Sequence, residues 1–80
     1  MNDWLTTNAE AVAAATGLEP GRLRLSSADE TALLDVARVA AHDSGDRTNA
    51  PLLCYLAGLA VGLSGSELGI AAAAVTTSAD

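Results

Sequence analysis

The chain has 80 residues, which is enough for one domain with a core of limited size. Its formal net charge is −6, with four arginines and no lysine, so it lacks the cations that nucleic acids and anionic membrane surfaces require. The single cysteine, Cys54, excludes an intrachain disulfide and a CxxC motif. Residues 1–8 contain no basic segment followed by an apolar run, so we expect no signal peptide and a cytoplasmic protein.

The apolar half of the composition consists mainly of small side chains. Eighteen residues are alanine, none is phenylalanine, and there is one tryptophan and one tyrosine. Alanine and leucine favour helices over sheets, so we predict an all-α protein, a small bundle of about four helices forming a single domain over residues 1–80. An alanine methyl group buries little area, so the monomer is expected to be short of core. A second copy in a homodimer would relieve that shortage.

The first helix is expected over residues 2–16. Asn2 or Asp3 can cap its start, and Gly17 followed by Leu18 is typical of a Schellman ending, in which glycine takes the left-handed conformation. Residues 22–26 follow, and arginine and leucine alternate over residues 22–25, but this segment is too short and too isolated to find a partner strand. We therefore expect an extended connector whose leucines touch the core.

The second helix has the clearest start signal in the chain. Ser27 and Glu30 match a capping box, in which the serine caps the helix and the glutamate reaches back. Apolar residues then recur at helical spacing, with Asp35 and Arg38 on a more polar side. The helix is expected to end near His42 or Asp43.

Pro51 is expected to begin the third helix, because a missing N–H costs nothing in the first turn. Residues 52–63 carry no charge, and a helix that is apolar all round predicts a buried element. Gly58 and Gly62 lie four residues apart on one face, and we predict close helix packing there, since each lowers helix propensity. A fourth helix over residues 66–76 would follow a second capping box from Ser64 to Glu67, with a frayed tail beyond it.

The apolar stretch over residues 50–75 is long enough to span a bilayer. Residues 64–67 interrupt it, and no basic cluster flanks it. The pattern therefore favours a helical hairpin in the core of the protein over a membrane span.

Most of the polar chemistry lies in the loop over residues 42–49. His42, Arg47 and Asn49 are candidates for contact with a partner or ligand, because histidine and arginine beside carboxylates can hold an anion or a polar side chain. The alternative is a structured turn, in which His42 caps the second helix and Arg47 pairs with Asp43 or Asp46.

No constellation of residues indicates catalysis or metal binding. His42 and Cys54 are the only soft metal ligands and have no HxxxH or CxxC companion, so we expect no metal and no cofactor. Cys54 is interpreted as a small buried apolar residue. Nucleophilic catalysis requires a base and an orienting group beside a serine or cysteine, and an enzyme built around His42 would require a second acid–base group nearby in space. The expected class is a non-enzymatic domain.

Asp43-Ser44-Gly45 in an acidic helical chain suggests an alternative function. It resembles the Asp-Ser-Leu motif of acyl carrier proteins, which attach phosphopantetheine to a serine at the start of a helix. In this chain Ser44 follows a helix, and glycine stands in place of leucine. A carrier protein modified on Ser44 is therefore kept as the second interpretation.

The centre of the chain carries a recognisable set of residues: Leu34-Asp35-Val36-Ala37-Arg38, Ala41-His42, Arg47, Ala50-Pro51-Leu52 and Leu56-Ala57-Gly58-Leu59-Ala60-Val61-Gly62. In these residues the chain resembles a family of short actinobacterial helical domains of unknown function. Domains of that family are found alone or attached to molybdenum cofactor guanylyltransferase-like proteins. The resemblance implies a protein-interaction module that assists the formation or insertion of molybdopterin guanine dinucleotide. Its expected protein partner is an enzyme of molybdenum cofactor biosynthesis.

Overall fold

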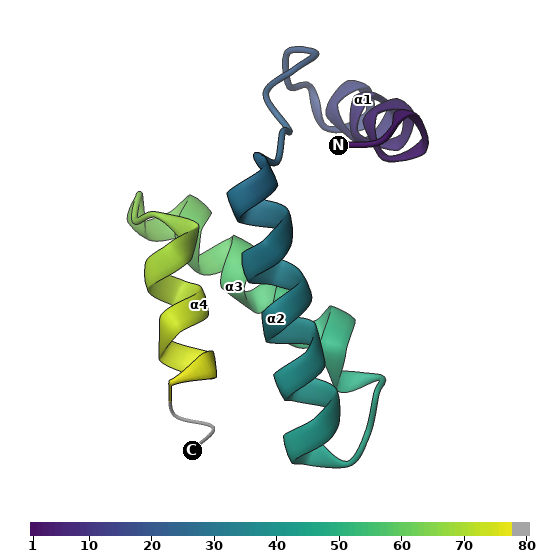
Figure 1. The fold of residues 1–80 in the computed structure, drawn as a ribbon. Helices are drawn as coiled ribbons and strands as arrows, with labels where there is room; N and C mark the ends of the chain where they lie inside the picture. Colours follow the sequence, from purple (N-terminus) through teal and green to yellow (C-terminus); the bar gives the residue numbers. More distant parts are fainter. Residues whose placement is uncertain (78–80) are drawn as a thin grey trace. The chain divides into compact units, whose positions relative to one another are not determined.

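The computed structural model describes residues 1–77 of the chain, and within them every regular element is a helix (Figure 1). The four helices are α1 (Asp3–Thr16), α2 (Ser27–Ser44), α3 (Asn49–Ser64) and α4 (Leu68–Thr76). The prediction of an all-α protein with about four helices is confirmed. The expected fraying of the tail concerns residues 78–80, which lie outside the described part of the chain.

The chain forms two compact units. The first covers Met1–Glu30 and contains α1, the connector and the first turn of α2, and the second covers Thr31–Asp80 and contains the rest of α2 with α3 and α4. Each unit is described by itself below. The expectation of a single domain over residues 1–80 stays a prediction.

Both ends of α1 follow the local signals in the sequence. The Asn2 side chain accepts a hydrogen bond from the Leu5 N–H at 2.8 Å, so Asn2 is the N-cap. At the other end Gly17 has a φ of 77°, and the Leu18 N–H donates to the Ala13 carbonyl at 2.8 Å. That pair of features is a Schellman ending, as predicted, and it needs glycine because other residues resist positive φ.

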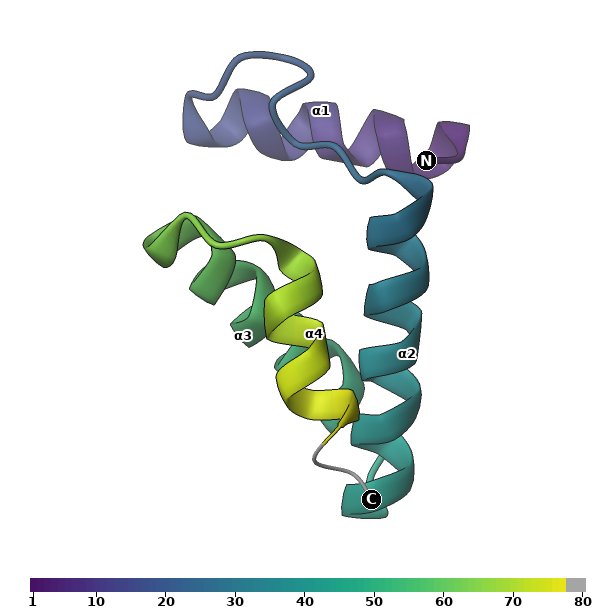
Figure 2. The ribbon, with the colours of Figure 1, turned by 60° about the vertical axis from the view of Figure 1, so that its left-hand side comes forward.

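The connector after α1 contains no strand, as expected, and runs back along the helix within the first unit (Figure 2). Leu23 and Leu25 are half-buried. A hollow of about 410 Å³ lies between the connector and α1, lined by Met1, Thr6, Ala9, Glu10, Gly21, Leu23, Arg24 and Leu25.

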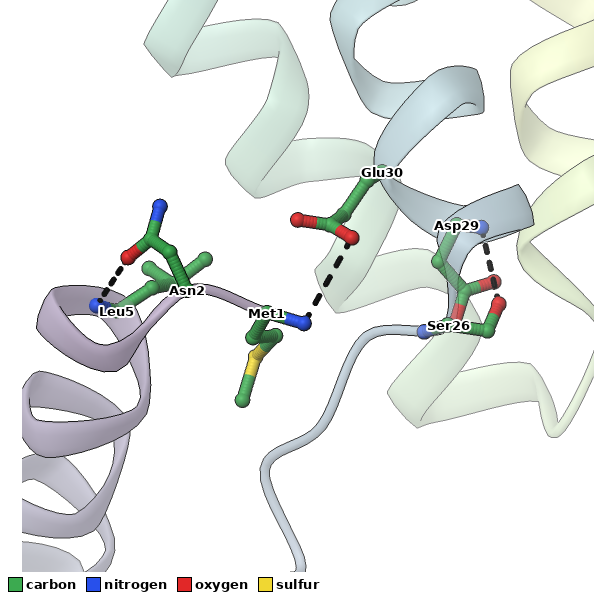
Figure 3. A network of polar contacts seen from close by, with 6 residues as sticks. All are labelled: Met1, Asn2, Leu5, Ser26, Asp29 and Glu30. Atoms are coloured by element: carbon green, nitrogen blue, oxygen red, sulfur yellow. Dashed lines mark hydrogen bonds and ion pairs between the residues drawn. The ribbon is translucent and has the colours of Figure 1, made fainter.

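The start of α2 has a capping box one residue earlier than predicted (Figure 3). The Asp29 N–H donates to the Ser26 Oγ at 3.0 Å, and the Ser26 N–H donates to the Asp29 carboxylate at 3.0 Å. The assignment of Ser27 and Glu30 to these roles was therefore wrong. Both registers fit the sequence, because two serines precede two acidic residues, and Glu30 instead lies 3.7 Å from the Met1 ammonium group.

The core of the second unit consists of small side chains. Val36, Val39 and Ala40 of α2 are buried, together with Ala57 of α3 and Ala72 of α4, and Val36 is the largest fully buried side chain. The Cys54 thiol of α3 also donates to the Leu33 carbonyl of α2 at 3.6 Å. The fully buried side chains of the three helices are therefore all alanine or valine.

The prediction that the third helix is buried is wrong for most of its length. Only Ala57 of α3 is buried, whereas four of its leucines and Tyr55 are exposed. The absence of charge shows that α3 is apolar on every side. It does not show that other helices of the same chain cover it.

The start signals predicted for α3 and α4 also need correction. The first residue of α3 is Asn49, so Pro51 lies within the first turn rather than at its first position, where its missing N–H is still harmless. The N-cap of α4 is Glu67, which makes no capping hydrogen bond with its side chain. The predicted box from Ser64 to Glu67 is absent because the Ser64 hydroxyl accepts a hydrogen bond from the Ser66 N–H at 3.1 Å.

We predict that Ser26→Ala lowers the free energy of unfolding by about 1 kcal/mol, since it removes the side-chain acceptor at an N-cap. Urea unfolding followed by circular dichroism measures the change. Ser66→Ala is the matched control, because Ser66 is an exposed serine whose hydroxyl makes no hydrogen bond among residues 1–77. Equal stability of the two variants would contradict the observed capping box.

Candidate functional site

The main surface feature of the second unit is a row of exposed leucines along α3. Leu52, Leu56, Leu59 and Leu63 follow one another at intervals of four, three and four residues, so they lie on one side of the helix. Their exposed fractions are 60%, 56%, 41% and 80%. We call these four residues the leucine stripe. Large apolar side chains that gather on a surface mark sites of interaction.

The leucine stripe faces outward because the opposite side of α3 carries the residues that face the other helices. Ala57 is buried, and Ala50, Cys54 and Val61 are half-buried, and all four lie within one sector of the helix. Small residues on this side leave room for α2, whose Leu33 carbonyl accepts a hydrogen bond from the Cys54 thiol. The leucines are therefore left on the far side, where no residue between 31 and 77 covers them fully.

One edge of the leucine stripe borders a groove of about 520 Å³. The lining comes from all three helices of the second unit: Val39, Ala40, Asp43 and Ser44 of α2, Asn49, Leu52, Leu53 and Leu56 of α3, and Ala74 and Val75 of α4. The groove is therefore mainly apolar, with the polar residues contributed by the end of α2 and the start of α3. An apolar side chain from another molecule could enter it.

Gly58 and Gly62 were predicted to mark close helix packing. A methyl group built at either position would meet no atom within 4 Å, so no element of the described chain approaches them closely. Both glycines are exposed and lie beside Tyr55, which is 68% exposed. Close helix packing at the two glycines therefore stays a prediction.

The polar loop between α2 and α3 is a structured turn held by three side chains. The Ser44 hydroxyl donates to the Ala40 carbonyl at 2.6 Å and accepts from the Asp46 N–H at 3.2 Å. The Asp46 carboxylate accepts from the Thr48 N–H at 2.9 Å and from the Thr48 hydroxyl at 2.6 Å. The hydrogen bonds from the Thr48 hydroxyl and N–H hold the pKa of Asp46 below its ordinary value.

The three predicted contact residues lie around this turn but are not part of its hydrogen bonding through their side chains. His42 is exposed in the last turn of α2, and Arg47 is exposed just before α3. Neither side chain makes an ion pair within residues 1–77, so the predicted pairing of Arg47 with Asp43 or Asp46 is wrong. Asn49 is half-buried and lines the groove. Contact of these residues with a partner stays a prediction.

Cys54 is half-buried rather than fully buried, and burial raises the pKa of its thiol. The thiol at neutral pH is therefore the protonated donor to the Leu33 carbonyl. Across residues 1–77 no three histidine, cysteine, aspartate or glutamate side chains gather in a way that could hold a metal ion. Within the same range no helix combines the length and apolar character that a membrane crossing requires.

Sequence reasoning missed the leucine stripe as a site, although its signal was present. The four, three, four spacing is the spacing of the apolar positions in a coiled coil, in which a helix packs along a second helix. The leucine spacing does not stand out in the sequence, because α3 carries apolar residues on every side.

The fold and this surface define a small all-α protein whose α3 exposes an apolar face among residues 1–77. The chain belongs to the family described as a domain of unknown function, DUF6457, whose model matches residues 1–80. No curated protein and no solved structure matches the chain.

We predict that Thr48→Val raises the pKa of Asp46 toward its ordinary value, because the variant removes the hydroxyl donor that lowers it. A group with a lowered pKa in the folded state stabilises the protein above its unfolded pKa, and this contribution is lost as the pH falls through the folded pKa. The variant should therefore lose less stability than the wild type upon acidification.

An NMR titration of the Asp46 carboxyl carbon measures the shift directly. Thr7→Val in α1 is the control, since Thr7 is an exposed threonine away from the turn. An unchanged pKa of Asp46 in Thr48→Val would show that the hydroxyl contributes nothing.

Proposed function

We propose that the chain is a non-enzymatic accessory domain of the cytoplasm that binds another polypeptide through the leucine stripe and the groove beside it. The observation that supports this most is the exposure of four leucines in register on a helix without charge. Surface leucines that occur singly are ordinary, but a continuous row presents an apolar strip to the solvent. A partner helix of matching spacing would remove this strip from water.

The stripe alone gives weak binding. Burial of the exposed part of four leucines contributes about 4–7 kcal/mol, and association costs about 4–15 kcal/mol in lost freedom of motion. Contacts beyond the stripe therefore have to add to the affinity. Such contacts would form near the start of α3, where Asn49 lines the groove and Arg47 is exposed.

The link to molybdenum cofactor biosynthesis rests on the family resemblance of the central residues. A domain that occurs both free and attached to guanylyltransferase-like proteins is suited to bringing proteins together. Within this proposal the partner is an enzyme that makes or inserts molybdopterin guanine dinucleotide. The uncharged face of α3 and the acidic chain are consistent with a protein partner.

Affinity capture from host extract tests the docking function. We expect Leu59→Glu to abolish recovery of the partner, because docking would bury an unpaired charge. Leu34→Glu is the matched control, since Leu34 is a leucine that is 71% exposed on α2 and outside the stripe. Arg47→Ala should weaken capture while leaving thermal stability nearly unchanged. Equal capture by the Leu59 and Leu34 variants would contradict the proposed docking surface.

The second candidate is a carrier protein modified on Ser44. An exposed Ser44 would permit modification, but its hydroxyl serves the turn at the end of α2 rather than the start of a helix. We expect no added mass when the protein is incubated with coenzyme A and a phosphopantetheinyl transferase. A gain of one phosphopantetheine group, absent in Ser44→Ala, would replace the docking proposal with the carrier function.

A further inference from the structure

We infer that the leucine stripe binds the same stripe of a second copy of this chain, with the two α3 helices antiparallel. This inference rests on the proposed docking function: the second copy uses the same surface and would compete there with a host protein partner. The spacing of the leucine stripe is symmetric along the helix. Its intervals of four, three and four residues read the same in both directions. An antiparallel pair therefore sets Leu52 against Leu63 of the second copy and Leu56 against Leu59 of the second copy.

Residues of opposite charge flank the leucine stripe. Arg47 precedes the stripe by five residues, and Glu67 follows it by four residues. Both side chains are exposed and make no ion pair within the described residues. An antiparallel pair brings Arg47 of each copy to Glu67 of the other, whereas a parallel pair would bring like charges together. The neighbouring Asp46 carboxylate is already held by Thr48.

The surfaces of the two copies also fit each other in shape. Leu63 is the most exposed leucine of the stripe, at 80%, and in the antiparallel pair it lies opposite Leu52, at the mouth of the groove of about 520 Å³. Along the same edge of the stripe, Tyr55 of one copy lies near Gly62 of the other, where the absence of a side chain leaves room for the ring. Each of these contacts occurs twice, as a two-fold axis requires.

Orientation is tested by crosslinking in a Cys54→Ala background, which removes the native thiol. Leu52→Cys and Leu63→Cys proteins are treated with a short bismaleimide, each alone and as a mixture. The antiparallel pair predicts a crosslinked dimer in the mixture and none in either protein alone. Crosslinking within either single variant would overturn the antiparallel arrangement.

Analytical ultracentrifugation over a dilution series measures the strength of the pair. We expect Leu59→Glu to raise the dimer Kd by at least about a hundredfold. Leu34→Glu should leave the Kd unchanged. Circular dichroism of each variant checks that its helices are intact, and the crosslinking comparison does not depend on the Leu59 variant.

A charge swap tests the pairing of Arg47 with Glu67 of the second copy. Arg47→Glu should raise the Kd by about tenfold, and adding Glu67→Arg in the same chain should restore it, because the swapped charges pair again. A double variant no tighter than Arg47→Glu would overturn the end contacts. A monomer at all concentrations would overturn the second copy as partner. If that monomer still captured a host protein that Leu59→Glu loses, the docking function would stand without self-association.

Discussion

The arrangement of the second unit depends on which side of α3 carries the small residues. Ala57 and its small neighbours occupy the side on which the Cys54 thiol reaches the Leu33 carbonyl of α2, and the buried side chains of the three helices are alanine and valine. A core built this way buries little apolar area for each residue. Because the small residues occupy the inner side of α3, its leucines lie on the surface. These leucines could have filled a larger core. Stability and surface chemistry therefore follow from one feature of the sequence.

The turn between α2 and α3 explains why polar residues gather near the stripe. The turn is short, and its hydrogen bonds are made by the side chains of Ser44, Asp46 and Thr48. Their engagement leaves His42 and Arg47 at the surface, and neither makes an ion pair with another residue of the range 1–77. A loop that looks like a binding site in the sequence therefore divides into residues that build the turn and residues that remain available for contact.

The number and type of the helices were predictable because breaks that contain glycine separate the helical segments, whereas capping signals marked only α1 and, with a shift, α2. Asn2, Gly17 and Leu18 define α1 through short-range hydrogen bonds that the structure contains. The capping box at α2 shifted by one residue because Ser26 and Ser27 precede Asp29 and Glu30, and local pattern cannot choose between the two registers. The burial of α3 was mispredicted for a different reason. Burial depends on what covers a helix, which the sequence of that helix does not contain.

The central claim is that the leucine stripe is covered by another polypeptide in the working protein. A photoreactive amino acid at position 63, in the intact chain within host cells, tests this most directly, with the same substitution at position 34 for comparison. Both positions are exposed leucines, at 80% and 71%. The account predicts a specific crosslinked protein at position 63 and none at position 34. No crosslink at position 63, or the same products at both positions, would contradict it.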